Sequence, residues 1–322
     1  IGKWIGYIDK YLLFPWILRR KLKQLPERSV VHIIDHSNAP YAKYLPQTPH
    51  LITCHDLMAI RSALGEIPQH EPKWTGKQQQ AMILRGLKRS QHIVSVSKAT
   101  RQDVARLVGD QAAHQHLIAN ALNDEFIQMA QHPRSKTTAA PPYVMHIGGE
   151  KWYKNRKAVL QIFAILAAKL PELELVIVGP EFSDAALSAT GCTTLKERIR
   201  YQSGISDAEL CSLYQGAEIL LFPSYLEGFG WPILEAQACG CTVATYQVEP
   251  MSSLNAIPDL AAGDGTDADI LASAAANYMQ LDSEDKAKLQ EKARAFAAQF
   301  SNAASAQAYH KLYQEVMDHA LK

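Results

Sequence analysis

The chain has 322 residues, of which 47% are hydrophobic and 20% charged, and its formal net charge is +1. This is the composition of an ordinary globular protein, and the balance of 33 basic with 32 acidic residues gives no overall field of the kind that attracts nucleic acid. No apolar run reaches the roughly 20 residues that a membrane-spanning helix needs, and the five cysteines form no C-x-x-C pair, which argues against a zinc or redox motif.

The first 24 residues, "IGKWIGYIDKYLLFPWILRRKLKQ", predict a helix that no strand precedes. Aromatic and apolar side chains are followed there by basic ones: Trp4, Tyr7, Tyr11, Phe14, Trp16 and Leu18, then Arg19, Arg20, Lys21 and Lys23. This mixture suits a peripheral contact with anionic lipid, although a core helix with a solvated end explains the same pattern. Because the cysteine count is odd and no signal peptide is present, we expect a cytoplasmic protein, at the inner face of the membrane if the lipid contact is made.

Short β-branched runs predict buried strands that alternate with helical segments. They cover residues 29–35, 49–56, 91–97, 115–121, 142–149, 173–179, 217–224 and 241–247. This alternation predicts an α/β protein with doubly wound parallel sheets. The polar, proline-bearing segment His132–Pro142 is the predicted linker between an N-terminal part and a C-terminal α/β domain.

A His-Asp pair, His55 and Asp56, ends the second predicted strand. From the residues alone, a capped turn is the default interpretation of such a pair. His36 ends the preceding strand on the same edge and is a weaker candidate for a functional residue.

A glycine-rich loop with three nearby cations follows the strand at 142–149. The loop holds Gly148 and Gly149, and the cations are Lys151, Lys154 and Arg156. Basic side chains with free backbone amides suit a diphosphate. A solvated basic helix start is the plainer alternative, but the helix dipole disfavours it.

The stretch "PSYLEGFGWPILEAQACG" places two glutamates around a second glycine-rich turn before a predicted helix. Gly228 and Gly230 allow close approach of the backbone to a ligand, and the helix start adds free N–H donors, so the turn suits a diphosphate at the carboxyl edge of a parallel sheet. Glu235 would then reach ribose hydroxyls, and Glu227 would accept hydrogen bonds from a second sugar. An acid that simply favours the helix dipole would account for Glu235 as well.

The same stretch, "EGFGWPILEAQACG", resembles the signature of retaining glycosyltransferases of family 4, which have the GT-B fold. Its hallmark is two glutamates eight positions apart around Gly-Phe-Gly. The resemblance implies that Glu227 contacts the donor sugar and Glu235 the nucleotide ribose, with the backbone of Phe229 and Gly230 facing the sugar and diphosphate.

The resemblance extends to the other loops. It implies that Lys154 binds phosphate; the arginine usual in this loop corresponds to Gly149, so Arg156 or Lys151 would supply the second charge. It also implies that His55 faces the donor sugar, with Asp56 orienting the imidazole or contacting the acceptor. The residues that would present backbone atoms to the base are Gly204 and Ile205.

For the fold, the resemblance implies two Rossmann-like domains facing a cleft, at 1–138 and 139–302, with the helix at 303–322 returning to the N-terminal domain. Only about four strands precede the predicted linker, fewer than a full GT-B domain has. We therefore expect an incomplete N-terminal domain and a natural polypeptide that begins before Ile1.

The implied activity is retaining transfer of a hexose from a nucleoside-diphosphate sugar to a glycan or lipid-linked acceptor, in synthesis of a bacterial surface polysaccharide. No Asp-x-Asp site is recognisable, so we expect no metal and no cofactor. The alternatives are another GT-B enzyme such as a sugar-nucleotide epimerase, and a catalytically silent sugar-nucleotide-binding subunit. An NAD-linked oxidoreductase would need a third glycine where Ile233 stands.

Overall fold

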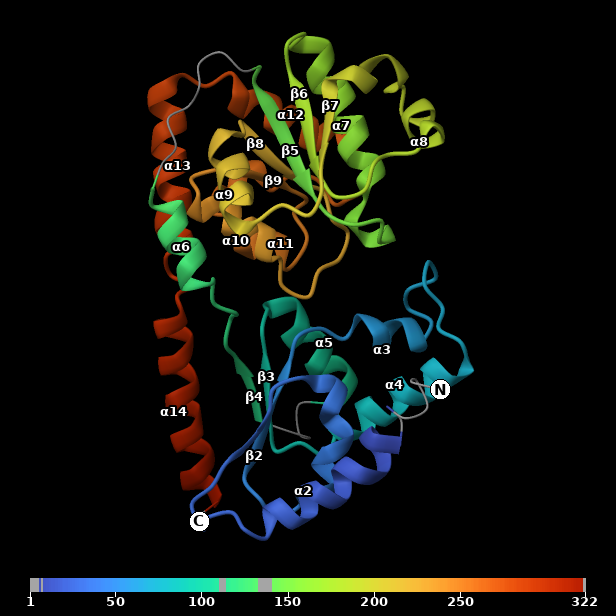
Figure 1. Cartoon of the computed structure of the whole chain (residues 1–322), viewed down its shortest axis with the longest axis vertical. Helices are drawn as coiled ribbons and strands as arrows, with labels where there is room; N and C mark the ends of the chain where they lie inside the picture. Colours follow the sequence, from blue (N-terminus) through green and yellow to red (C-terminus); the bar gives the residue numbers. More distant parts are fainter. Residues whose placement is uncertain (1–5, 7, 110–113, 133–140, 321–322) are drawn as a thin grey trace. The chain divides into compact units, whose positions relative to one another are not determined.

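A computed structural model describes residue 6 and residues 8–109, 114–132 and 141–320. The chain divides into two compact units (Figure 1): an N-terminal unit of residues 1–119 with 306–322, and a C-terminal unit of residues 120–305. The division falls at 119/120, earlier than the predicted 138/139, because α6 (Asp124–Ala130) packs against α9 (Asp207–Gly216) of the C-terminal unit. Most of the predicted linker, residues 133–140, lies outside the described residues.

The N-terminal unit is built on a four-stranded parallel sheet with the order β1-β2-β3-β4. Its strands are β1 (Val31–Ile33), β2 (His50–Cys54), β3 (His92–Ser95) and β4 (His114–Leu117). Parallel neighbours need crossover connections, and these are η2 (His36–Tyr44) after β1, α3 (Met58–Ala63) and α4 (Trp74–Leu87) after β2, and α5 (Lys98–Val108) after β3.

The two faces of this sheet are covered by different parts of the chain. Ile52 and Ile93 face the crossover helices, whereas Leu51 and Val94 face α14 (Asn302–Ala320) and pack with its Leu312. Figure 1 shows α14 running along β3 and β4. The last helix therefore belongs to the N-terminal unit from residue 306 onward, which is the return that the resemblance implies.

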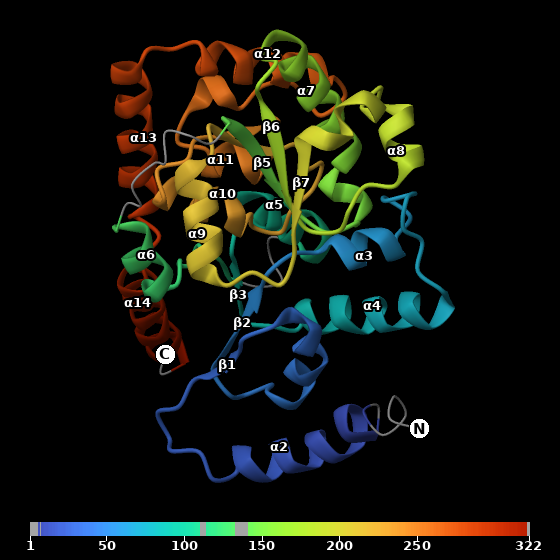
Figure 2. The same ribbon diagram turned by 45° about the horizontal axis from the view of Figure 1, so that its top comes forward.

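The predicted N-terminal helix is a π-helical turn, η1 (Asp9–Leu13), that continues into α2 (Phe14–Leu22). In Figure 2, α2 is the dark blue helix near the N-terminus. The first part of the predicted helix, residues 1–5 with residue 7, lies outside the described residues. Among the described helices, none is both long and apolar enough to cross a membrane.

The C-terminal unit contains a five-stranded parallel sheet with the order β7-β6-β5-β8-β9. Its strands are β5 (Tyr143–Ile147), β6 (Glu174–Val178), β7 (Ile199–Gln202), β8 (Ile219–Phe222) and β9 (Val243–Thr245). β7 was not predicted from the sequence, because "IRYQ" contains no apolar run and only its first residue is buried. In the described part of the chain, the strand order reverses only here, between β5 and β8.

Helices cover both faces of the second sheet. One apolar core joins a sheet face to α7 (Arg156–Lys169) and α12 (Ala268–Met279), while α9 and α10 (Trp231–Ala238) contact the strands from the other side. The other helices of the unit are η3 (Trp152–Lys154), α8 (Asp184–Ala189), η4 (Thr193–Arg198), α11 (Met251–Leu254), η5 (Pro258–Leu260) and α13 (Ser283–Ala297).

Candidate active site

The reversal of strand order in the C-terminal unit brings two glycine-rich loops together. One loop, residues 148–155, follows β5, and the other, residues 223–230, follows the neighbouring β8. The loops are joined by a hydrogen bond of 2.8 Å from the Tyr225 N–H to the Tyr153 carbonyl, and the Trp152 and Tyr225 rings stack with centroids 6.5 Å apart. In open α/β sheets, ligands bind in the crevice at such a switch point.

Lys154 and Glu227, predicted from separate motifs, form an ion pair in this place. Lys154 Nζ lies 2.7 Å from Glu227 Oε1, and the two side chains are only 18% and 10% exposed. The Lys154 side chain is therefore largely withdrawn from solvent, where it contacts Glu227. The pair places a cation next to a carboxylate, and groups of these kinds can bind phosphate and hydroxyl groups, respectively.

Gly148 of the first loop is tightly surrounded by side chains. A Cβ at this position would lie 3.0 Å from His146 Nε2 and 3.5 Å from Lys154 Cδ. At Gly149, by contrast, a Cβ would meet open space. Gly148 thus lets the backbone pass directly beside the cation.

His146 is a buried polar residue of β5 that the sequence analysis did not single out. Its Nδ1 lies 2.9 Å from the Leu221 carbonyl, and its Nε2 has no hydrogen-bond partner among the described residues. Burial lowers the pKa of His146 to about 4, so the ring is neutral at pH 7. The one signal in the sequence was a histidine two positions before a glycine pair.

The second loop ends at Gly230, which is the N-cap of α10. Its φ of 117° lies in the region that favours glycine, and Pro232 follows in the first turn as predicted. Phe229 is 5% exposed and its ring contacts that of Trp231 at 5.4 Å, so the loop between Gly228 and Gly230 is anchored by a buried aromatic. The first turn of α10 therefore lies at this sheet edge; within it the Ile233 N–H donates to the Gly230 carbonyl, and Pro232 carries no N–H.

Glu235 lies one turn further into α10 and is largely buried. The hydroxyl of Tyr214 donates a hydrogen bond of 3.3 Å to its Oε2. Burial raises the pKa of the Glu235 carboxyl, and the charge of Asp207 raises it further against the effect of the Tyr214 hydroxyl. A carboxylate in this position is costly to keep ionised, and hydroxyl donors from a ligand would reduce that cost.

Gly204 and Ile205 form the loop between β7 and α9. Gly204 has a φ of 65°, and Ser206 follows as the N-cap of α9 in a capping box with Glu209. This loop leads into α9, which contacts α10 and whose Tyr214 bonds Glu235.

Arg156 and Lys151 differ in what holds them. The Arg156 guanidinium donates to the Pro180 carbonyl and lies 4.2 Å from the centre of the Phe182 ring, and burial lowers its pKa. Lys151 is exposed. Both line a cavity of about 490 Å³ beside α7 and α8, together with Trp152 and Phe182. A larger cavity of about 690 Å³, beside α6 and α13, contains none of the predicted site residues.

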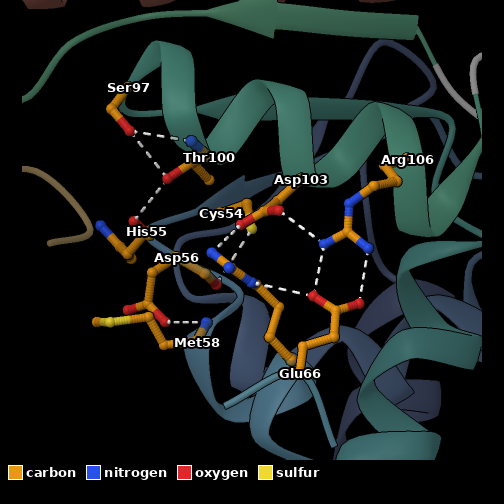
Figure 3. Close-up of polar contacts among 10 residues, drawn as sticks. Cys54, His55, Asp56, Met58, Glu66, Ser97, Thr100, Asp103 and Arg106 are labelled. Carbon is orange, nitrogen blue, oxygen red and sulfur yellow. Dashed lines mark hydrogen bonds and ion pairs between the residues drawn. The ribbon is translucent and has the colours of Figure 1, made fainter. Parts of the chain in front are cut away.

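In the N-terminal unit, His55 and Asp56 follow β2 as predicted (Figure 3). Asp56 Oδ1 accepts a hydrogen bond of 2.9 Å from the Met58 N–H and so caps the turn before α3, the role that the residues alone suggested. His55 Nε2 lies 3.1 Å from the Ile34 carbonyl, and its carbonyl accepts from the Thr100 hydroxyl. The His36 ring lies 6.5 Å from that of His55, so the sheet edge carries two adjacent imidazoles.

An ion-pair network fixes the segment that follows this turn. Glu66 binds both Arg61 at 3.2 Å and Arg106 at 2.6 Å, and Asp103 also binds both arginines (Figure 3). The network links the end of α3 to α5, and it therefore holds the His55–Asp56 turn between two anchored helices.

Two family models match this chain. A family model described as glycosyl transferases group 1 matches residues 128–296, and one for glycosyltransferase family 4 matches residues 3–126. The chain is similar to O-antigen chain mannosyltransferase B of Escherichia coli, at 25% identity over 76% of this chain and 67% of that protein. It is also similar to the D-inositol 3-phosphate glycosyltransferase of Mycobacterium avium, at 26% identity over 79% of this chain and 61% of that protein.

Solved structures share the fold. Sucrose-phosphate synthase from Thermosynechococcus elongatus superimposes with a TM-score of 0.70 at 21% identity, over 90% of this chain and 74% of that one. A UDP-forming trehalose-phosphate synthase from Burkholderia xenovorans gives 0.71 at 12% identity, over 95% and 78%.

Two parallel-sheet α/β units of this kind make up the GT-B fold. The chain belongs to the group 1 glycosyltransferase family, whose model covers more than half of it.

Proposed function

We propose that this chain is a retaining, metal-independent hexosyltransferase. It takes a hexose from a nucleoside-diphosphate sugar and transfers it to a glycan or lipid-linked acceptor, in the synthesis of a surface polysaccharide. The single observation that carries the proposal is the Lys154–Glu227 ion pair at the switch point of the second sheet, next to the start of α10. The O-antigen mannosyltransferase relative supports the polysaccharide role.

In this proposal each group has one task. Lys154 and the N–H groups at the start of α10 bind the diphosphate and stabilise it as it leaves. Glu227 accepts hydrogen bonds from donor-sugar hydroxyls, and Glu235 does so from the ribose. The bond between the sugar C1 and the phosphate oxygen breaks while the acceptor oxygen bonds to C1 on the same face, and the departing phosphate takes the acceptor proton.

His55 stays a candidate for contact with the donor sugar, because its ring stands at the carboxyl edge of β2 with His36 beside it. In this proposal Asp56 stabilises the turn that follows His55, because its carboxylate accepts the hydrogen bond of the Met58 N–H. Burial lowers the pKa of His36, against the opposing charge of Asp56, which favours a neutral hydrogen-bonding ring.

One observation favours a second candidate, a sugar-nucleotide-binding subunit without turnover. Gly149 stands where the family's arginine is usual, and Arg156 is held by Pro180 and Phe182. The second cation of the diphosphate site would then have to be the exposed Lys151. Turnover separates the two candidates, since both bind the donor.

The test begins with thermal unfolding in the presence of UDP-, GDP-, ADP- and dTDP-sugars, with NAD⁺ as the control ligand. A true donor at 100 times its Kd adds about 2.7 kcal/mol to the free energy of unfolding. Incubation with the donor and candidate acceptors then shows transfer, and NMR of the anomeric proton shows whether configuration is retained. Activity that survives EDTA supports metal independence, and stabilisation by NAD⁺ alone would overturn the proposal.

We also propose that the acceptor is membrane-proximal. The described part of the N-terminal stretch exposes large apolar side chains and has basic residues next to them. The exposed apolar side chains include Leu12, Leu13, Phe14, Trp16 and Ile17. Arg20 lies over the Trp16 ring at 4.7 Å, which places a cation directly beside an exposed aromatic. Such a surface suits the interface of an anionic membrane.

A further inference from the structure

We propose that His92, His114 and His319 form a binding site for a divalent transition metal in the N-terminal unit. One ring nitrogen from each histidine lies within 4.8 Å of the others. His92 and His114 are the first residues of β3 and β4, so the cluster stands at the opposite end of this sheet from His55. It is thus separate from the candidate active site and is not used by the proposed transfer reaction.

The sheet register explains why two of the histidines meet. His92 pairs with His114 in the parallel ladder, and Val94 pairs with His116 two positions on. Residues two apart on a strand share a face, and Val94 packs against α14. All three strand histidines therefore project from the face that α14 covers.

The third ligand, His319, lies on α14, and the spacing of residues on this helix explains why it faces the sheet. Leu312, Val316 and His319 follow one another at intervals of four and three, which keeps them on one side of the helix. Leu312 and Val316 pack on the sheet with Leu51 and Val94. His319 continues this stripe and lies over the amino ends of the strands, where it meets the other two rings.

The three rings lie close together with interplanar angles of 16° to 27°, so the exposed rings must turn toward a common point to bind a metal. The centroid of His319 lies 5.5 Å from that of His114 and 6.1 Å from that of His92, and the His92 and His114 rings are 4.8 Å apart. His116 Nε2 lies 3.1 Å from His92 Nδ1. A hydrogen bond of this kind to one nitrogen orients a ring whose other nitrogen binds metal, so His116 acts as a positioning residue.

The donor set selects the class of metal. Imidazoles suit zinc, copper and nickel, whereas magnesium and calcium require oxygen ligands. With bonds of about 2.0–2.1 Å, tetrahedral zinc needs ligand nitrogens about 3.4 Å apart. His114 and His319 are exposed and can close this difference by side-chain rotation.

A bound metal would fasten the last turns of α14 to β3 and β4. The three ligands lie far apart in the sequence, on β3, β4 and α14, so the metal would add a cross-link to the packing that already joins these elements. The site would therefore have a structural task that is separate from the transfer reaction, for which no metal is expected.

The test uses the full chain dialysed against EDTA and then titrated with ZnCl₂ by isothermal calorimetry. We expect one zinc ion per chain and a rise of several degrees in the thermal midpoint. His114→Ala and His319→Ala should each weaken zinc binding at least tenfold and abolish the thermal shift. His310→Ala is the matched control, because His310 is exposed on the same helix and bonds Gln314 outside the cluster.

Far-UV circular dichroism confirms that each variant is folded. The proposal is overturned if His319→Ala binds zinc as tightly as the unaltered chain, or if His310→Ala loses as much affinity. Absence of saturable binding at zinc concentrations on the order of 1 mM would also overturn it. Transferase activity is measured with and without zinc as a separate readout. A histidine variant that loses zinc binding but keeps transferase activity would support a metal site that is separate from the active site.

Discussion

At the scale of single residues, the ion pair of Lys154 and Glu227 joins two loops whose members are 73 positions apart. Each charge is largely withdrawn from water, and each is balanced by the other. Removing one partner leaves the other without compensation, which costs more than the loss of an exposed pair. The pair therefore ties the geometry of the site to its stability.

We predict that Lys154→Ala lowers turnover by about 10²–10³-fold, the effect of losing one preorganised donor to the leaving group. Because Glu227 would be left unpaired, the free energy of unfolding should also fall, by about 1–3 kcal/mol. Steady-state kinetics and chemical denaturation measure the two effects. Lys157→Ala, at an exposed position of α7, is the control and should change neither. Near-normal turnover in Lys154→Ala would move the phosphate role to Lys151 or Arg156.

We predict that Glu235→Gln weakens nucleotide binding by about tenfold or more, since the ribose loses a charged acceptor. Its effect on stability should depend on pH. Burial raises the pKa of Glu235, so the folded protein holds this proton more tightly than the unfolded chain, and wild-type stability falls as pH rises from the ordinary value of 4.5 through the raised pKa.

Glutamine does not ionise, so it avoids the free-energy cost of a buried negative charge, and its side-chain oxygen can still accept a hydrogen bond from the Tyr214 hydroxyl. The thermal midpoint of Glu235→Gln should therefore gain on the wild type between pH 5 and pH 8. A difference between the two proteins that is the same at both pH values would contradict this account, and unchanged affinity for the free nucleotide would remove the ribose assignment.

At the scale of helices and strands, local sequence patterns predicted most of the elements, but they could not predict contacts between residues far apart in the chain. Strands with apolar runs were predicted to within a few residues, and the helix from Trp231 was expected because Pro232 marks a first turn. β7 was missed because its side chains are mixed in character. No local pattern could indicate that Lys154 contacts Glu227, or that a histidine of α14 meets two strands.

We predict that the N-terminal stretch binds anionic vesicles at low salt. Each basic residue near such a surface contributes about 1 kcal/mol, so the double variant Lys21→Ala/Lys23→Ala should bind roughly 30-fold more weakly. Co-sedimentation with anionic and zwitterionic liposomes measures this. Lys292→Ala, at an exposed site on α13, should behave as wild type. If the unaltered chain stays in the supernatant when anionic vesicles sediment at low salt, the surface has another role.

At the scale of the whole molecule, the two units have separate cores. The residues predicted to bind the nucleotide lie in the C-terminal unit, whereas His55 and Asp56 lie in the N-terminal unit. Leu312 is 3% exposed and belongs to the N-terminal core although it lies near the end of the chain. Damage to one core should therefore leave the ligand site of the other intact.

We predict that Leu312→Ala lowers the stability of the N-terminal unit by about 2–4 kcal/mol, because it leaves a cavity between α14 and the sheet. Nucleotide affinity should stay within about twofold of wild type. Denaturant unfolding followed by tryptophan fluorescence, together with nucleotide titration, gives both quantities. The control is Lys311→Ala, at the adjacent exposed position. A large loss of nucleotide affinity in Leu312→Ala would show that the cores are coupled.

The placement of α14 also has a consequence for how the protein is made. During translation, residues 31–118 leave the ribosome with one face of their sheet lacking its cover, since residues 306–320 are synthesised after the entire C-terminal unit. Domains generally fold in the order of synthesis. Here the contiguous second unit can finish first, while Leu51, Val94 and Ile118 of the first wait for the helix. That interval is when a chaperone would have most to protect, and a truncated translation product would expose this apolar face permanently.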